Sequence, residues 1–102
     1  MMTYEDARKK GLDACVKKIG IDFVKKYSDK ACSAYGDRED FAFCFVGVSD
    51  RPDAYYDSQG LVLDGNGFSD WPYQACCNVW YNDGHIEFLD CKLPEEIQKI
   101  RT

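Results

Sequence analysis

The chain has 102 residues, 45% of them hydrophobic and 15% aromatic, which suits a single domain with its own core and excludes an intrinsically disordered chain. The formal net charge of −5 is uneven, because residues 37–91 hold two Lys or Arg against eleven Asp or Glu, whereas residues 1–36 hold eight against five. An acidic middle disfavours direct nucleic-acid binding and favours a basic protein surface as partner.

The sequence also bears on location. The first residues lack a basic start followed by an apolar run, so we expect no secretion signal. The longest apolar run, residues 41–48, is too short to span a bilayer, and we expect no membrane partner. We therefore place the protein in the cytoplasm and expect its six cysteines to be thiols rather than disulfides.

The N-terminal third predicts one kinked helix or a pair of helices. Thr3 precedes an acidic first turn, as at a helix N-terminus, and apolar residues recur at helical spacing as far as Gly20. Asp22 can begin a second helix whose apolar stripe reaches Tyr35, with Gly36 as its stop. Because Gly20 is only a weak helix breaker, the sequence leaves open whether there is one helix or two.

The next segment predicts a central strand followed by a long loop. Residues 41–48 are apolar at both alternating sets of positions, which is typical of a strand covered on both faces. Residues 49–73 contain two turn-rich stretches, and only residues 60–64 between them predict a short strand.

Residues 74–91 predict a β-hairpin, because Asp83-Gly84 suits a two-residue type I′ turn and β-branched and aromatic residues flank it. The register that follows pairs Asn82 with His85, Tyr81 with Ile86, Val79 with Phe88, Cys77 with Asp90 and Cys76 with Cys91. The apolar face of this hairpin collects Val79, Tyr81, Ile86 and Phe88.

These elements predict an α+β fold. An N-terminal helix or helix pair packs on an antiparallel sheet of three to four strands, with residues 41–48 beside the hairpin. Leu93 and Pro94 begin a short C-terminal helix, since proline is favoured in the first helical turn.

We predict no catalytic residue, no metal and no cofactor, and we favour a binding module over an enzyme. Asp64–Asp70 resembles a calcium-binding loop only weakly, because Phe68 stands where an oxygen ligand is needed and Ala75 where the closing acid should be. His85 is the only histidine and lies at a turn, which suggests a surface position rather than a catalytic pair.

The remaining functional signal is aromatic and acidic. Tyr and Trp are enriched in binding hot spots, and acidic neighbours suit a basic partner. We therefore predict a small inhibitor, immunity or adaptor type of protein, monomeric or homodimeric, that binds a basic protein surface through its loop at residues 50–73. The predicted contact residues are Tyr55, Tyr56, Asp57, Asp64, Asp70 and Trp71, and we expect Trp71 to be exposed.

Two alternatives remain open. A pocket for a small ligand or a substrate could lie between the helices and a curved sheet, lined by Phe43, Phe45, Tyr27 and Trp80. A thiol or metal sensor could instead use Cys76 and Cys91, which the predicted register places across the hairpin on one face.

Overall fold

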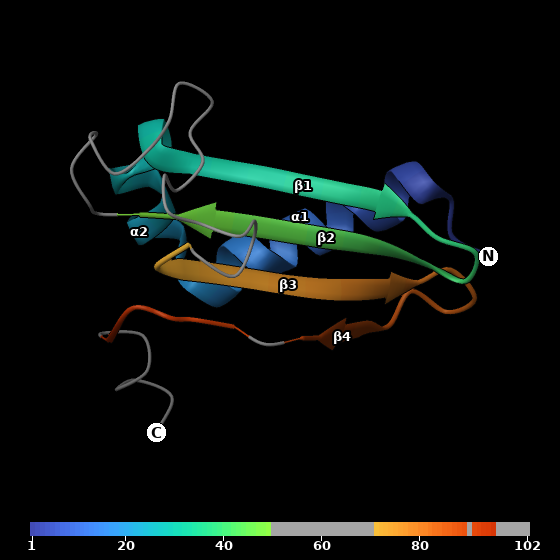
Figure 1. Cartoon of the computed structure of the whole chain (residues 1–102). Coiled ribbons are helices and arrows are strands. Elements are labelled where there is room, and N and C mark those ends of the chain that lie inside the picture. Colours follow the sequence, from blue (N-terminus) through green and yellow to red (C-terminus); the bar gives the residue numbers. More distant parts are fainter. Residues whose placement is uncertain (50–70, 90, 96–102) are drawn as a thin grey trace.

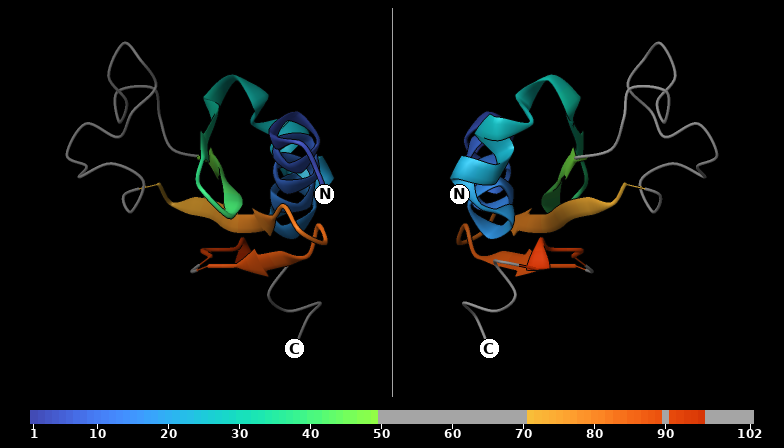
Figure 2. Two further views of the ribbon diagram at one scale, coloured as in Figure 1. Left: turned by 90° about the vertical axis from the view of Figure 1, so that its right-hand side faces the viewer. Right: turned by 90° about the vertical axis from the view of Figure 1, so that its left-hand side faces the viewer.

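The computed structural model describes residues 1–49, 71–89 and 91–95, and this part of the chain forms two layers. A four-stranded antiparallel sheet has the order β1-β2-β3-β4, and the helices cover one of its faces (Figure 1). Figure 2 shows the same arrangement from both ends of the sheet. The elements are α1 (Tyr4–Ile19), α2 (Ile21–Lys26), a 3-10 turn (Ser28–Lys30), β1 (Ala31–Asp37), β2 (Phe41–Val48), β3 (Tyr73–Trp80) and β4 (Ile86–Phe88). The predicted α+β fold, with helices packed on an antiparallel sheet, is confirmed.

Some expected features lie outside the described residues. These are the short strand at residues 60–64, the calcium-like loop at Asp64–Asp70 and residues 96–102 of the expected C-terminal helix. Among the helices that the structure does describe, none has the length and apolar character needed to cross a membrane.

Helix α1 begins and ends as its sequence predicts. The Thr3 side chain accepts a hydrogen bond from the backbone N–H of Asp6 at 3.2 Å, which satisfies one of the free donors of the first turn. The buried side of the helix follows the predicted spacing, with Ala7, Gly11, Cys15 and Ile19. Gly20 has φ 122°, so the chain breaks there and α2 is a separate, short helix.

The prediction that helix continues to Tyr35 is wrong. Helix α2 ends at Lys26, and Ala31–Asp37 is strand β1, paired with β2 along its whole length. In the structure burial alternates along this segment, with Cys32, Ala34 and Gly36 half-buried, although its apolar residues do not alternate in the sequence. Non-local pairing to an apolar central strand decided between helix and strand, because it supplies hydrogen bonds that local propensity does not account for.

Strand β2 spans Phe41–Val48, as predicted, and lies between β1 and β3. Its helix-facing side chains pack in the main core, which comprises Ala7, Cys15, Ile19, Ala42, Cys44, Val46, Val48, Ala75, Cys77 and Val79. On the opposite face, Phe45 packs with Trp71 and Cys76 in a second, smaller cluster. Both faces are covered, which explains why the strand has no alternation of apolar and polar residues.

The predicted register of the β3–β4 hairpin is wrong by two residues. Val79 pairs with Ile86, and the backbone N–H of Trp80 bonds to the carbonyl of His85 at 3.0 Å, so the loop has four residues, Tyr81–Gly84. The backbone of Tyr81 bonds instead to Met2 and Asp40, which withdraws it from the hairpin ladder. Within the paired residues of β3 and β4 this shift of two keeps each side chain on its face, so Val79, Ile86 and Phe88 still share one face.

Close contact between α1 and the sheet yields the first testable prediction. A Cβ added at Gly11 would lie 2.4 Å from Cys44 Sγ and 2.9 Å from Val79 Cγ2. We expect Gly11→Ala to lower the free energy of unfolding by about 1–3 kcal/mol, because overpacking outweighs a gain in helix propensity of at most about 1 kcal/mol. Urea denaturation followed by circular dichroism measures this change.

Gly36→Ala is the matched control, since the heavy atom nearest to its added Cβ is Arg38 Nε at 3.9 Å. Removing the clashing sulfur in the double variant Gly11→Ala/Cys44→Ala should restore part of the loss caused by Gly11→Ala. Equal stability of Gly11→Ala and the unmodified protein would contradict the close contact.

Candidate functional site

The predicted contact loop can be assessed only at its C-terminal end. Tyr55, Tyr56, Asp57, Asp64 and Asp70 all lie outside the described residues. Trp71 is described, and the expectation that it is exposed is wrong, because only 1% of it is accessible to solvent.

Trp71 packs against the sheet face opposite the helices. It forms a cluster with Phe45 and Cys76, and a Cβ at Gly47 would lie 2.7 Å from its ring atom Cδ2. The glycine therefore leaves room for the indole to lie directly on strand β2. In this position Trp71 holds the N-terminal end of β3 onto the sheet.

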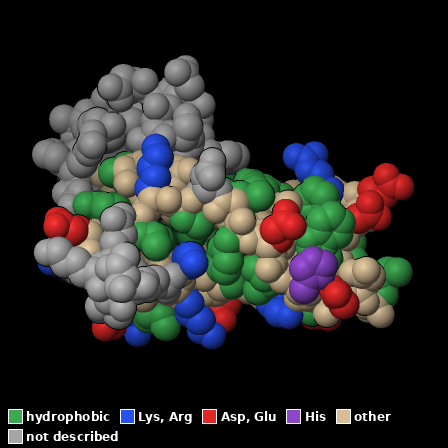
Figure 3. Space-filling view, turned by 90° about the horizontal axis from the view of Figure 1, so that it is seen from below, with side chains coloured by type: hydrophobic (Ala, Val, Ile, Leu, Met, Phe, Trp, Pro, Cys, Tyr) green, Lys and Arg blue, Asp and Glu red, His purple; other side chains and the backbone are tan. Residues whose placement is uncertain are grey.

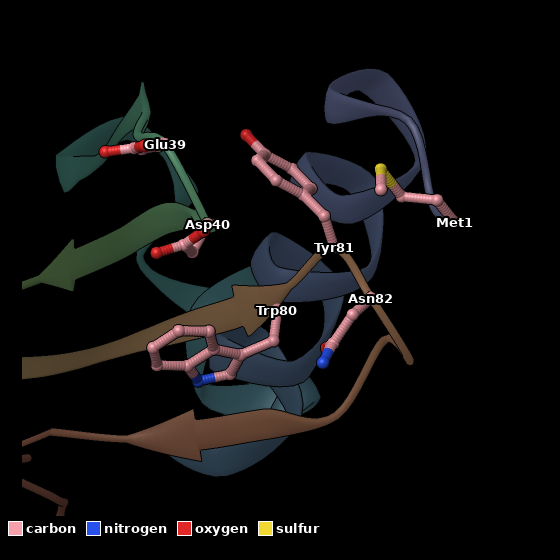
Figure 4. Close-up of a pocket in the computed structure, with 6 residues that line it drawn as sticks. All are labelled: Met1, Glu39, Asp40, Trp80, Tyr81 and Asn82. Atoms are coloured by element: carbon pink, nitrogen blue, oxygen red, sulfur yellow. The ribbon is translucent and has the colours of Figure 1, made fainter.

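The described surface has a hollow at the end of the sheet where two turns meet. One turn joins β1 to β2 and the other joins β3 to β4, and the hollow has a volume of about 210 Å³. Figure 4 shows its lining residues, which are Met1, Glu39, Asp40, Trp80, Tyr81 and Asn82. Carboxylates come from the first turn, and aromatic and amide groups come from the second.

Tyr81 fixes the two turns relative to each other. Its backbone N–H donates to the carbonyl of Asp40 at 3.0 Å, and its carbonyl accepts from the N–H of Met2 at 2.7 Å. Its hydroxyl donates to the carboxylate of Asp37. Lost hydration and then this bond to a negative group raise the pKa of Tyr81 to about 12, so the hydroxyl remains a neutral donor at physiological pH.

The carboxylates on the acidic side of the hollow are not paired with a cation in the described residues. The side chains of Glu39 and Asp40 are exposed, and neither carboxylate has an ion-pair partner within the described ranges. Lys10 Nζ donates to the carbonyl of Gly84 at 2.5 Å, and neither Lys10 nor Arg38 lines the hollow. The two carboxylates outnumber the amino group of Met1, another lining residue, so the hollow is negative and can attract a cation.

An aromatic row extends from the hollow across the outer face of the sheet. The ring centroids of Phe41 and Trp80 are 5.0 Å apart, and those of Trp80 and His85 are 5.7 Å apart in a stacked arrangement. His85 Nδ1 lies 2.6 Å from Asp83 Oδ1, and the hydrogen bonds from His85 to this carboxylate lower the pKa of Asp83. Figure 3 shows His85 at the surface among hydrophobic and acidic side chains.

Sequence reasoning missed the pairing of Glu39 and Asp40 with Trp80 and Tyr81. We expected residues 31–35 in a helix, which left Glu39 and Asp40 in a charged linker. In an antiparallel meander the first and third turns lie at the same end of the sheet. Glu39 and Asp40 could therefore have been placed beside the β3–β4 turn from the sequence, but only if residues 31–37 had been recognised as a strand.

The structure does not bring together the residues expected to line a pocket under the helices. Phe43, Phe45 and Trp80 lie on the outer face of the sheet, as the alternation along β2 and β3 requires, whereas Tyr27 packs against the helix-side core. This set of lining residues is therefore wrong. Between α1 and the sheet lies the main core, and its members are at most 4% exposed.

The alternative in which Cys76 and Cys91 form a thiol pair is contradicted by the structure. Cys76 lies opposite Leu89, whose N–H bonds to its carbonyl at 2.9 Å, and its side chain belongs to the outer cluster. Cys91 packs against the helix-side core instead. The two thiols therefore lie on opposite faces of the sheet.

Three other cysteines meet under α1, and the sequence analysis did not anticipate this. Cys15 Sγ lies 3.7 Å from Cys77 Sγ, and Cys77 is paired with Cys44 on the neighbouring strand. All six cysteines are free thiols. The pKa values of Cys44 and Cys77 are raised, chiefly by hydrogen bonds with neighbouring thiols and then by burial, so these groups stay protonated and act as small apolar side chains.

Within residues 1–49, 71–89 and 91–95, no group of three or more His, Cys, Asp or Glu side chains is placed to hold a metal ion. No protein-family model, curated protein or solved structure matches the chain.

Trp71 provides a test of its structural position. We expect Trp71→Ala to lower the free energy of unfolding by about 3–5 kcal/mol, because it removes the largest side chain of the outer cluster. Trp71→Phe, which keeps an apolar ring, should lose less. Thermal and urea unfolding measure both changes, and an unchanged midpoint for Trp71→Ala would show that the indole is not packed as described.

The thiols provide a second test. In the native protein at pH 8, we expect a thiol reagent to modify the partly exposed Cys32 and Cys91 first. Cys15, Cys44 and Cys77 should react only as the protein unfolds, because they are buried and the pKa values of Cys44 and Cys77 are raised. Mass spectrometry of alkylated peptides identifies the modified sites, with the denatured protein as control. Rapid native modification of Cys15 or Cys77 would contradict the buried cluster.

Proposed function

We propose that this protein is a small binding module for a basic protein partner and that the hollow between the two turns is its anchor site. The observation that supports the proposal most strongly is the free carboxylate pair of Glu39 and Asp40 beside Trp80 and Tyr81. Carboxylates attract and orient a basic surface, and aromatic side chains supply contact area.

The carboxylates and the aromatic residues are expected to contribute different amounts of binding energy. An exposed ion pair is worth about 0.2–1 kcal/mol, so two carboxylates alone would bind a partner weakly. Aromatic anchors are the usual source of larger binding energy, and Trp80 is held in place by Phe41 and His85. We therefore assign steering mainly to the acids and anchoring mainly to the aromatic residues.

The loop at residues 50–73 extends this proposal. Tyr55, Tyr56, Asp57, Asp64 and Asp70 lie outside the described residues and remain predicted contacts. The excess of acidic residues over residues 37–91 includes both the loop and the two turns, and it gives this part of the chain one sign of charge. The described ends of this loop, Val48 and Tyr73, lie at the end of the sheet opposite the hollow, so a partner would extend along the sheet to reach both.

The buried position of Trp71 changes its part in the proposal. With 1% of its surface accessible, Trp71 packs on the sheet and is not available as a contact for the partner. We further propose that the module acts in the cytoplasm as a monomer or homodimer, with no direct contact to nucleic acid. It would serve as an inhibitor, immunity or adaptor type of protein.

Charge removal in the hollow tests the proposed function. We expect the double variant Glu39→Gln/Asp40→Asn to bind a synthetic peptide of mixed Lys, Arg and Ser roughly two- to thirty-fold more weakly than the unmodified protein, the loss expected for two exposed ion pairs. Isothermal titration calorimetry measures the affinity, and the difference should shrink as salt is raised above about 0.15 M.

The matched control is Glu87→Gln/Asp29→Asn, which makes the same change in net charge at exposed positions outside the hollow. It should bind the peptide as the unmodified protein does, apart from a small general effect of charge. Equal losses in the two double variants would mean that net charge, and not the hollow, attracts the peptide.

A further inference from the structure

The hollow combines a charged rim with an apolar wall. In Figure 4 the side chains of Glu39, Asp40 and Trp80 extend toward the same side of the two turns, while those of Tyr81 and Asn82 extend in other directions. Met1, Trp80 and Tyr81 supply the apolar lining. A group that fits this site should therefore be cationic at its edge and apolar on its faces.

We propose that the hollow binds the guanidinium group of an arginine side chain from the partner. The inference rests on the proposed function and adds the chemistry of the bound group. A guanidinium is planar, carries five N–H donors in its plane, and packs its faces against aromatic rings. Its edge would donate to the carboxylates of Glu39 and Asp40 while its plane contacts Trp80.

Lysine fits the same surface less well. An ammonium group is a compact, strongly hydrated charge, and it would have to give up water against the Trp80 and Met1 side of the hollow. A guanidinium is more weakly hydrated, so less hydration is lost there. The mixed lining therefore discriminates between two side chains of equal charge.

The chain itself contains an example of this arrangement. The guanidinium carbon of Arg8 lies 4.6 Å from the centroid of the Tyr35 ring, and its Nη2 donates to Glu5 at 2.9 Å. This arginine is thus held by one aromatic face and one carboxylate. The hollow likewise presents an aromatic ring, that of Trp80, and the carboxylates of Asp40 and Glu39.

No described arginine of the chain occupies the hollow. Arg8 is engaged with Glu5 and Tyr35, and Arg38 lies beside Gly36, with its Nε 3.9 Å from the position of an added Cβ there. Neither contributes to the lining. The site is therefore open to an arginine supplied from outside.

Three synthetic peptides that differ only at one central residue test the inference. The central residue is arginine, lysine or citrulline, which keeps the shape of arginine without its charge. By calorimetry at about 0.15 M salt, we expect the arginine peptide to bind at least about tenfold more tightly than the other two. In Asp40→Asn this preference for arginine over lysine should fall to less than about threefold.

Asp40→Asn is a mild change because Asp40 is exposed, and its backbone bond to Tyr81 does not involve the side chain. Circular dichroism checks that the variant is folded, and Glu87→Gln serves as the matched control that should keep the preference. Equal affinity for arginine and lysine would overturn the inference while leaving basic-partner binding intact. Retention of the arginine preference in Asp40→Asn would place the arginine site elsewhere, and failure to bind any of the three peptides would overturn the inference together with the proposed anchor.

Discussion

The close packing of α1 on strands β2 and β3 is the constraint on which the rest of the structure depends. At Gly11 the helix has no side chain, and the sulfur of Cys44 and a methyl group of Val79 fill the space that one would take. Around this point the thiols of Cys15, Cys44 and Cys77 pack as small apolar groups. A larger residue at any of these positions would lift the helix from the sheet. These three cysteines thus serve as small side chains where the helix packs closely on the sheet.

With the sheet fixed under α1, Tyr81 determines the end that we assign to binding. Its backbone links the first residues of the chain to the β1–β2 turn, and its hydroxyl bonds to Asp37. These bonds take Tyr81 out of the hairpin ladder and widen the loop to four residues. They also bring Asp40 next to Trp80, so the acidic and aromatic sides of the hollow result from the same contacts. Tyr81 therefore both sets the length of the hairpin loop and positions the residues that line the hollow.

The elements predicted correctly from the sequence are those whose signals are local. The apolar run at residues 41–48 and the cap at Thr3 define β2 and the start of α1 without reference to any other segment. The errors depend on non-local contacts: pairing with β2 makes residues 31–37 a strand, and the bonds of Tyr81 set the hairpin register. The burial of Trp71 likewise depends on Gly47, which lies in strand β2. The hollow could not be assembled from the sequence because it requires both corrections at once.

Mapping of the bound surface by nuclear magnetic resonance tests the central claim most directly. An arginine-containing peptide is added to the ¹⁵N-labelled protein, and the backbone amide and indole signals are followed. We expect the largest shifts at residues 38–41 and 80–85 and at the Trp80 indole N–H, with α1 unaffected. Shifts confined to the lysine-rich helix, or to residues 50–73 without the two turns, would contradict the assignment of the hollow as the anchor site.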